Sequence, residues 1–167
     1  MPRRPRCFHP GAATHITARG VDQQPIFLSD LDRWTLLALL RRVTSQVRWH
    51  VHAWCLMTTH YHLLVVPTAS TNVSRALQKL NSVYAREFNS RHGRRGHLFG
   101  QRFADAPIES DGHGENTIAY ILDNPVRAGI VARYDDWNWS GLATLRPRDE
   151  LGTLALPNRH EHVRRHG

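Results

Sequence analysis

The sequence predicts an α+β fold in which helices back an antiparallel sheet. Two observations favour it: β-rich and helical runs alternate along the chain, and two β-rich runs are separated only by Thr58-Thr59, a spacing typical of a hairpin. A third is length, because 167 residues suit one domain and would leave two domains short of core. We therefore expect one domain over residues 1–145 and a flexible C-terminal tail over 146–167.

The first two elements are a short strand and an amphipathic helix. Residues 15–19 form a β-like run. Ser29 is a typical N-cap for a helix over residues 31–47. Its apolar residues recur at helical spacing, which leaves an arginine-rich outer face: Leu36, Leu37, Leu40 and Val43.

A hairpin and a second helix follow. The runs 49–57 and 61–66 are the two hairpin strands, and Pro67 ends the second because proline cannot donate to a sheet. Asn72 can cap a helix that reaches roughly Asn89. One face of this helix is apolar and is expected in the core: Val73, Leu77, Leu80 and Tyr84.

The last elements are a loop, a strand and a third helix. Residues 91–96 form a basic loop, 97–108 contain a possible fourth strand, and 115–124 form a helix that Pro125 stops. The order β-α-β-β-α-β-α matches a ferredoxin-like split βαβ arrangement. Such a sheet has one face covered by helices and one free to carry a site.

The charge of the chain indicates an acidic partner. Lys and Arg number 22 against 14 Asp and Glu, a net charge of +8, and Lys79 is the single lysine. Arginine binds phosphate oxygens bidentately and stacks on flat rings, so the surplus suits a nucleic acid. Codon usage in a GC-rich genome also favours arginine over lysine, so only the net sign serves as evidence.

Other classes of protein are excluded by what the sequence lacks. Cys7 and Cys55 are far apart and match no zinc-binding spacing. No apolar run has the length of a membrane span, and the N-terminus has no apolar stretch of a signal peptide. We expect a cytoplasmic protein without a membrane partner.

Two histidine pairs stand at alternate positions in the hairpin strands. Alternation places His60 and His62 on one face and Tyr61 on the other, and two neighbouring imidazoles can ligate one divalent ion. His50 and His52 form the same pattern in the preceding strand. With 12 histidines in the chain, such pairs also arise by chance, so the spacing alone does not identify a metal site.

The third helix carries a tyrosine outside its expected core face. Ile118, Ile121, Leu122 and Pro125 cluster on one side at helical spacing. Tyr120 and Asn124, one turn apart, point to nearly the opposite side. The plain interpretation is a surface tyrosine. If the helix lies across the open face of the sheet, however, its phenol and amide reach the histidine pair.

These stretches together resemble a known family. Residues 53–65 (AWCLMTTHYHLLV) are similar to the His-hydrophobe-His strand of the REP-associated tyrosine transposases, the IS200-like, single-tyrosine branch of the His-hydrophobe-His endonucleases. Residues 11–20, 97–103 (HLFGQRF) and 120–129 (YILDNPVRAG) agree in the same order. The resemblance spans roughly residues 5–142, and the combination of the histidine strand with Y-x-x-x-N-P-V-R-A-G is specific.

The resemblance implies a role for four residues. By position, His60, His62 and Asn124 would hold a divalent metal, Mg²⁺ or Mn²⁺, and Tyr120 on its catalytic helix would be the nucleophile. Attack by the tyrosine would leave a 5′-phosphotyrosine and a free 3′-hydroxyl, and the same site could reseal the strand by transfer. Thr58-Thr59 stands where the family usually has Pro-Asn or Thr-Asn, a change expected to be harmless. Residues 120–125 read Tyr-Ile-Leu-Asp-Asn-Pro in place of the usual Tyr-Ile-His/Glu-Leu-Asn-Pro, which leaves Tyr120 and Asn124 intact.

The implied substrate is single-stranded or hairpin DNA from palindromic repeats. The predicted phosphate contacts are arginines and one glutamine: Arg3, Arg4, Arg6, Arg19, Arg91, Arg94, Arg95, Gln101 and Arg102. One chain carries the whole residue set, so we expect a monomer, with a homodimer as the alternative.

Two other classes of function remain open on the sequence. A non-catalytic single-strand binder of ferredoxin-like fold would be expected to show an aromatic-rich strand, and none is visible. A metal-dependent nuclease that activates water would use the same histidines without forming a covalent adduct with DNA.

Overall fold

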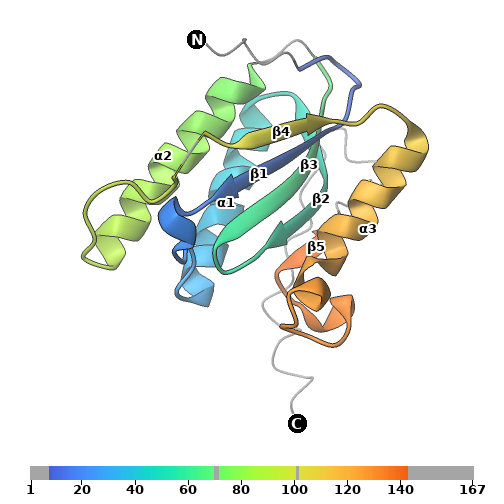
Figure 1. Cartoon of the computed structure of the whole chain (residues 1–167). Coiled ribbons are helices and arrows are strands. Elements are labelled where there is room, and N and C mark those ends of the chain that lie inside the picture. The colour runs from blue at the N-terminus through green and yellow to red at the C-terminus, as the bar shows by residue number, and fades with distance from the viewer. Residues whose placement is uncertain (1–7, 70–71, 101, 143–167) are drawn as a thin grey trace.

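The computed structural model describes residues 8–69, 72–100 and 102–142, which form one five-stranded antiparallel sheet and three α-helices (Figure 1). The strand order is β4-β1-β3-β2-β5. None of the helices among these residues is long and apolar enough to cross a membrane. In chain order the elements are β1 (Thr14–Arg19), α1 (Asp30–Gln46), β2 (Trp49–Leu56), β3 (His60–Pro67), α2 (Val73–Arg91), β4 (Ala104–Pro107), α3 (Asp111–Arg127) and β5 (Ser140–Leu142), with 3₁₀ turns η1 (Val21–Gln23) and η2 (Tyr134–Asp136).

The centre of the sheet is the hairpin of β2 and β3 with β1 alongside. Thr58 and Thr59 form the turn, which closes through a hydrogen bond of 2.8 Å from the Met57 amide to the His60 carbonyl. β1 runs antiparallel to β3 and pairs Arg19 with His60 at the end near this turn. The histidine strand is therefore central, with a neighbour on each side.

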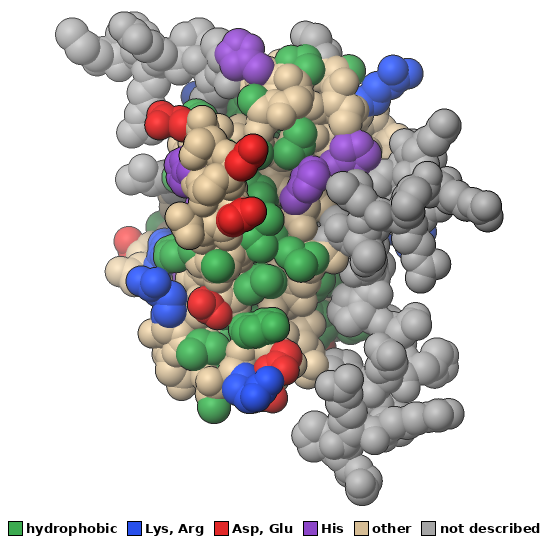
Figure 2. Space-filling model, turned by 90° about the vertical axis from the view of Figure 1, so that its right-hand side faces the viewer, with side chains coloured by type: hydrophobic (Ala, Val, Ile, Leu, Met, Phe, Trp, Pro, Cys, Tyr) green, Lys and Arg blue, Asp and Glu red, His purple; other side chains and the backbone are tan. Residues whose placement is uncertain are grey.

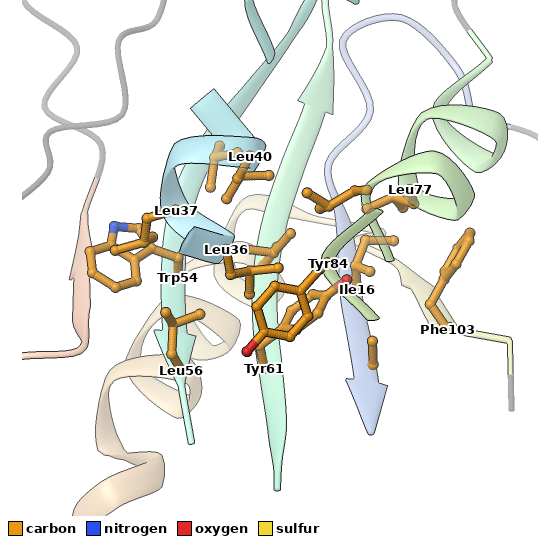
Figure 3. Close-up of a cluster of buried hydrophobic side chains, with 14 of the residues drawn as sticks. Ile16, Leu36, Leu37, Leu40, Trp54, Leu56, Tyr61, Leu77, Tyr84 and Phe103 are labelled. Atoms are coloured by element: carbon orange, nitrogen blue, oxygen red, sulfur yellow. The ribbon is translucent and has the colours of Figure 1, made fainter. Parts of the chain in front are cut away.

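Helices α1 and α2 cover one face of the sheet and enclose the main core with it (Figure 3). α1 begins at a capping box in which Ser29 accepts from the Asp32 amide and Asp32 accepts from the Ser29 amide. The apolar stripes of both helices pack against the inward residues of the strands. The strands contribute Ile16, Trp54 and Leu63, and the helices contribute Leu36, Leu40, Leu77 and Leu80. The fold therefore buries most of its apolar surface on this side.

Helix α3 lies on the opposite face, against β2 and β3 (Figure 1). Ser110 caps it by accepting a hydrogen bond from the His113 amide. Its buried residues are Thr117, Ile121 and Pro125, and Ile121 joins a small apolar cluster with Ala53, Cys55, Met57 and Leu64. A single helix therefore covers only part of this face.

The fold class and the order of the seven main elements are confirmed, but the ends predicted for the third helix are wrong. The helix begins at Asp111 instead of Glu115, and it continues through Pro125 to Arg127. Pro125 has no N–H to donate to the Ile121 carbonyl, so the helix loses one hydrogen bond there without ending. The helix ends instead at a Schellman motif formed by Gly129 (φ 67°) and a hydrogen bond from the Ile130 amide to the Pro125 carbonyl.

Three short elements, η1, η2 and β5, were not predicted, because each spans only three residues. The predicted tail, residues 146–167, lies outside the described residues. The assignment of residues 1–145 to a single domain therefore stays a prediction.

Candidate active site

His60 and His62 open strand β3 and project from the face that α1 and α2 leave free. Their ring centroids are 4.9 Å apart and the rings are nearly perpendicular. Tyr61, between them, is fully buried on the other face, where its hydroxyl donates to Oδ1 of Asn81 at 2.7 Å. The strand alternation read from the sequence is therefore what the fold adopts.

Both imidazoles are held through the same ring nitrogen. Nδ1 of His60 lies 3.0 Å from the hydroxyl of Thr59. Nδ1 of His62 lies 2.9 Å from Nε2 of His15 and 3.1 Å from the Thr17 hydroxyl, both on β1. Nε2 of His62, by contrast, is buried and forms no hydrogen bond with any described residue. A buried polar atom without a partner is costly, so its lone pair is available to a ligand.

The histidines are neutral at neutral pH. Burial, together with the nearby His60, His15 and Arg19, lowers the pKa of His62 to about 3, while a hydrogen bond with the Asn124 side chain acts in the opposite direction. Burial and then the Arg19 charge lower the pKa of His60 to about 4. Burial also lowers the pKa of His15. Neutral imidazole is the form that binds a metal ion.

Helix α3 places Tyr120 beside His62 and His15. Its ring centroid lies 5.8 Å from that of His62 and 6.0 Å from that of His15, and 39% of the residue is exposed. Thr117 and Ile121, which are buried, lie three residues before and one residue after Tyr120. Tyr120 therefore lies on the flank of the helix, beside its buried face.

The prediction that Tyr120 and Asn124 point nearly opposite the core face is therefore wrong by about a quarter turn of the helix. The buried stripe runs through Thr117, Ile121 and Pro125, whereas Ile118 and Leu122 are only half-buried on the other flank. Asn124 follows Tyr120 by one turn, and its Nδ2 donates to the Tyr120 carbonyl at 2.7 Å. Its Oδ1 is the atom left for a ligand.

The chain has four tyrosines, and only one lies at the histidines. Tyr61 and Tyr84 are fully buried, and burial raises the pKa of each phenol above its usual range. The Tyr84 hydroxyl donates to the Ile26 carbonyl at 2.5 Å. Tyr134 is exposed, but it lines a groove on the outer side of α3.

The second histidine pair lies elsewhere on the sheet. His50 and His52 stand at the start of β2, away from the hairpin turn, with ring centroids 6.4 Å apart. A β-bulge between Val51 and Ala53 interrupts the strand there. His50 pairs with Val66 at the far end of β3 from His60. No tyrosine ring is in contact with this pair among the described residues.

Two of the predicted DNA contacts have partners within the fold. Arg91 binds the buried Asp32 carboxylate at 2.6 Å and also donates to the Thr35 hydroxyl, which ties the end of α2 to the start of α1. Arg94 donates to Gln24 at 2.6 Å and lies 6.0 Å from the Phe88 ring. Both side chains are already engaged.

The other predicted contacts divide into two groups. Arg19, Arg95 and Arg102 are exposed, and Arg19 lies beside His60 at the end of β1. Predicted contacts that lie outside the described residues are Arg3, Arg4, Arg6 and Gln101.

Three residues near the site were missed. His15 and Thr17 contact His62, and the guanidinium of Arg127 lies 5.3 Å from the Tyr120 ring centroid. The alternation of residues 15–19 would have placed His15 and Thr17 on one face of their strand. Arg127 follows Tyr120 by two helical turns, which would have placed both on one side of α3.

The outer side of α3 has a different character. Figure 2 shows apolar side chains running down this face between acidic ones. A groove on this face is lined by apolar and acidic residues: Glu115, Ile118, Ala119, Leu122, Asp123 and Tyr134. Carboxylates repel phosphates, so this groove is unsuited to DNA.

A sheet with a His-Tyr-His strand that faces a helix-borne tyrosine is the arrangement expected of single-tyrosine DNA transposases. The family model described as "Transposase IS200 like" matches residues 10–124, and the chain belongs to that family. It is a DNA transposase by class. No curated protein matches the chain significantly.

Two solved structures share the fold. A REP-associated tyrosine transposase bound to a REP hairpin superimposes with a TM-score of 0.70 at 20% identity, over 84% of this chain and 82% of that one. A candidate transposase from Deinococcus radiodurans superimposes with a TM-score of 0.50 at 16% identity, over 74% of this chain and 97% of that one. The α+β architecture is therefore that of known transposase structures.

Proposed function

We propose that this transposase is a metal-dependent endonuclease and strand transferase for single-stranded DNA, with Tyr120 as its nucleophile. The observation that carries the proposal is the juxtaposition of Tyr120 with His62. The two rings lie 5.8 Å apart on the open face of the sheet, and the His62 nitrogen Nε2 is buried without a partner. Of the four tyrosines, Tyr120 alone combines exposure with contact to the histidines.

The residues present fit a divalent metal ion. Two neutral imidazoles and the Asn124 amide oxygen would supply two nitrogen ligands and one oxygen ligand, a set compatible with Mn²⁺ and Mg²⁺. No group of three or more His, Cys, Asp and Glu side chains suited to a metal occurs among the described residues, so the third protein ligand that we propose is the Asn124 amide. A bound divalent ion would polarise the scissile phosphate and offset charge in the transition state.

The reaction is a transesterification that conserves the phosphodiester bond. The Tyr120 oxygen attacks the phosphorus and loses its proton to solvent, while the bond from phosphorus to the 3′-oxygen breaks and that oxygen takes up a proton. The products are a 5′-phosphotyrosine and a free 3′-hydroxyl. Attack by a 3′-hydroxyl on the phosphotyrosine reverses the step, so strand transfer needs no ATP.

The proposed substrate is a DNA hairpin with a flanking single strand. The structure with 20% identity is described as bound to a REP hairpin, which supports this class of substrate here. Arg19, which is opposite His60 on β1, and Arg127, which lies over the Tyr120 ring, are both exposed and would contact phosphates beside the scissile bond. Arg95 and Arg102 are exposed and free to extend this contact along the strand.

The test is cleavage of a labelled hairpin oligonucleotide with a single-stranded flank in the presence of Mn²⁺. Tyr120→Phe removes one oxygen atom, so we expect no cleavage and no covalent protein–DNA adduct, with DNA affinity within about fivefold of wild type, since a lost exposed contact is worth less than about 1 kcal/mol. Tyr134→Phe is the matched control, because it removes the same atom from the other exposed tyrosine.

Cleavage by Tyr120→Phe at the wild-type rate would refute the nucleophile. Cleavage by wild type without any adduct would favour the nuclease that activates water. Binding without cleavage under every metal condition would favour a single-strand binder.

A further inference from the structure

The two nitrogens of the His62 ring have opposite surroundings. Nδ1 lies within 3.1 Å of two polar atoms, Nε2 of His15 and Oγ1 of Thr17. Nε2 is buried and forms no hydrogen bond with any described residue. A neutral imidazole carries a single proton, so the partners of one nitrogen decide whether the other carries a lone pair or a proton.

The crowding at Nδ1 indicates where the proton lies. If Nδ1 were unprotonated, its single lone pair would have to serve two neighbours at once. A protonated Nδ1 avoids this conflict, because one N–H can be shared between two acceptors. A proton on Nε2 would form no direct hydrogen bond with a described residue, although the Asn124 side chain is close enough to favour the protonated ring.

His15 is the better fixed of the two neighbours. Its ring stacks on that of His62 with centroids 5.1 Å apart, and it also contacts the edge of Tyr120 at 6.0 Å. A threonine hydroxyl rotates and can donate to one tautomer or accept from the other, so Thr17 alone selects neither. An imidazole packed on both sides keeps its nitrogen in place.

We propose that His15 is a positioning residue that accepts a hydrogen bond from the Nδ1–H of His62. The proton is thereby kept on Nδ1, and the Nε2 lone pair is presented to the divalent ion. His15 is not itself a ligand, because its Nε2 is directed at the far side of the His62 ring. The inference rests on the proposed function for the identity of the ion. The tautomer of His62 is a property of the metal-free protein.

Two measurements test this on the full chain without DNA. Long-range proton–nitrogen correlation spectra of isotope-labelled protein at neutral pH show which His62 nitrogen is protonated, and calorimetry gives the affinity for Mn²⁺. Wild type should show a proton on Nδ1. His15→Phe keeps a ring but removes the acceptor, so the proton should redistribute to Nε2 and Mn²⁺ affinity should fall roughly 10–100-fold.

Rescue and control variants separate this role from simple packing. His15→Gln offers an amide oxygen to Nδ1, so it should restore the wild-type tautomer and most of the affinity. His50→Phe makes the same change in the other histidine pair and should alter neither measurement. If His15→Phe fails to fold, Thr17→Val provides the test. In that variant His15 is the remaining partner of Nδ1, and we expect His62 to keep its proton on Nδ1.

Three results would overturn the inference: a proton on Nε2 in wild type, an Nδ1 proton that persists in His15→Phe, or an unchanged Mn²⁺ affinity despite a shifted tautomer. A loss of the Nδ1 proton in Thr17→Val would do the same. These results are independent of cleavage by Tyr120→Phe, so failure of this inference and failure of the proposed function are distinguishable.

Discussion

The two faces of the central sheet are built by the same strands but do different work. On β1, Ile16 and Ala18 enter the core under α1 and α2, while His15 and Thr17 alternate with them on the other face. On β3, Tyr61 is buried on the core side and His62 faces Tyr120. Alternation along a strand therefore separates the residues that hold the fold from those that carry the site.

The two faces also differ in how completely helices cover them. Two long amphipathic helices seal the core face, whereas one helix rests on the other through a small apolar cluster around Ile121. The site face consequently leaves Tyr120 39% exposed beside the buried His62. Substitutions on one face should chiefly lower stability, and on the other they should chiefly lower activity.

The largest effect that distinguishes the two histidine pairs is expected for His62→Ala. Loss of a metal ligand should reduce Mn²⁺ affinity and cleavage by more than the roughly 10–100-fold that loss of a supporting hydrogen bond costs. His50→Ala should change both by less than about twofold, since it lies away from Tyr120. Equal losses in single-turnover cleavage by the two variants would show that the pair was assigned to the wrong strand.

The next comparison is between Leu77 on the core face and Ile121 on the site face, in their effects on stability and on cleavage. Leu77→Ala should lower the free energy of unfolding by roughly 2–5 kcal/mol, because Leu77 is fully buried in the main core. Below its melting temperature, the folded protein should still cleave at nearly the wild-type rate. Chemical denaturation and single-turnover cleavage measure the two quantities.

Ile121→Ala should behave in the opposite way. Its cluster is small, so the loss of stability should lie near the lower end of the same range of roughly 2–5 kcal/mol. Because Ile121 holds the helix that carries Tyr120, cleavage should fall by up to about 100-fold, as a displacement of about 1 Å can cost that much. If Leu77→Ala loses more activity than Ile121→Ala, the division between the faces is wrong.

Two arginines give a smaller contrast. Arg91 is paired with the buried Asp32 carboxylate, so Arg91→Ala should destabilise the fold by roughly 1–3 kcal/mol without changing how DNA affinity depends on salt. Arg19→Ala should be nearly neutral for stability and should reduce the slope of log affinity against log salt by about 0.7. Binding titrations at several salt concentrations decide this, and a flatter slope for Arg91→Ala would contradict it.

The smallest effect is the pH dependence of stability that the buried histidine imposes. The pKa of His62 is lowered to about 3 in the folded state, so the unfolded chain binds more protons below its ordinary pKa of about 6.5. Stability should therefore fall as pH drops from about 6.5 toward 5, with His62 contributing at most about 1.4 kcal/mol per pH unit.

His62→Ala should flatten this dependence. Urea unfolding of wild type and variant at about pH 7, 6 and 5 gives the difference in slope directly. Parallel pH profiles for the two proteins would mean that the histidine is not buried as neutral imidazole.

Local patterns were enough to predict the fold class and to bring His62 and Tyr120 together as a candidate site. Period-two alternation predicted the faces of His60 and Tyr61, and Ser29 and Asn72 mark the starts of α1 and α2 as predicted. Helical periodicity found the buried stripe of α2. These features depend on neighbours in the sequence, which is why they can be read without the fold.

What was missed depends on contacts between distant segments. β5 has three residues, and its pairing with β2 is visible only in the folded sheet. Arg91 was predicted to bind phosphate because nothing in the sequence shows that Asp32, 59 positions earlier, is its partner. The quarter turn between the predicted and observed placement of Tyr120 arises because Thr117, a polar residue, shares the buried stripe of α3.

The most direct test of the site face is to identify the residue that becomes bonded to DNA. The protein would be incubated with Mn²⁺ and a hairpin oligonucleotide carrying a single-stranded flank, the covalent product digested with a protease, and the nucleotide-bearing peptide sequenced by mass spectrometry. We expect a phosphodiester on Tyr120, whose ring is the one tyrosine ring in contact with His62 and His15 among the described residues. Attachment at Tyr134 or at any other residue, or strand cleavage with no attached peptide, would contradict it.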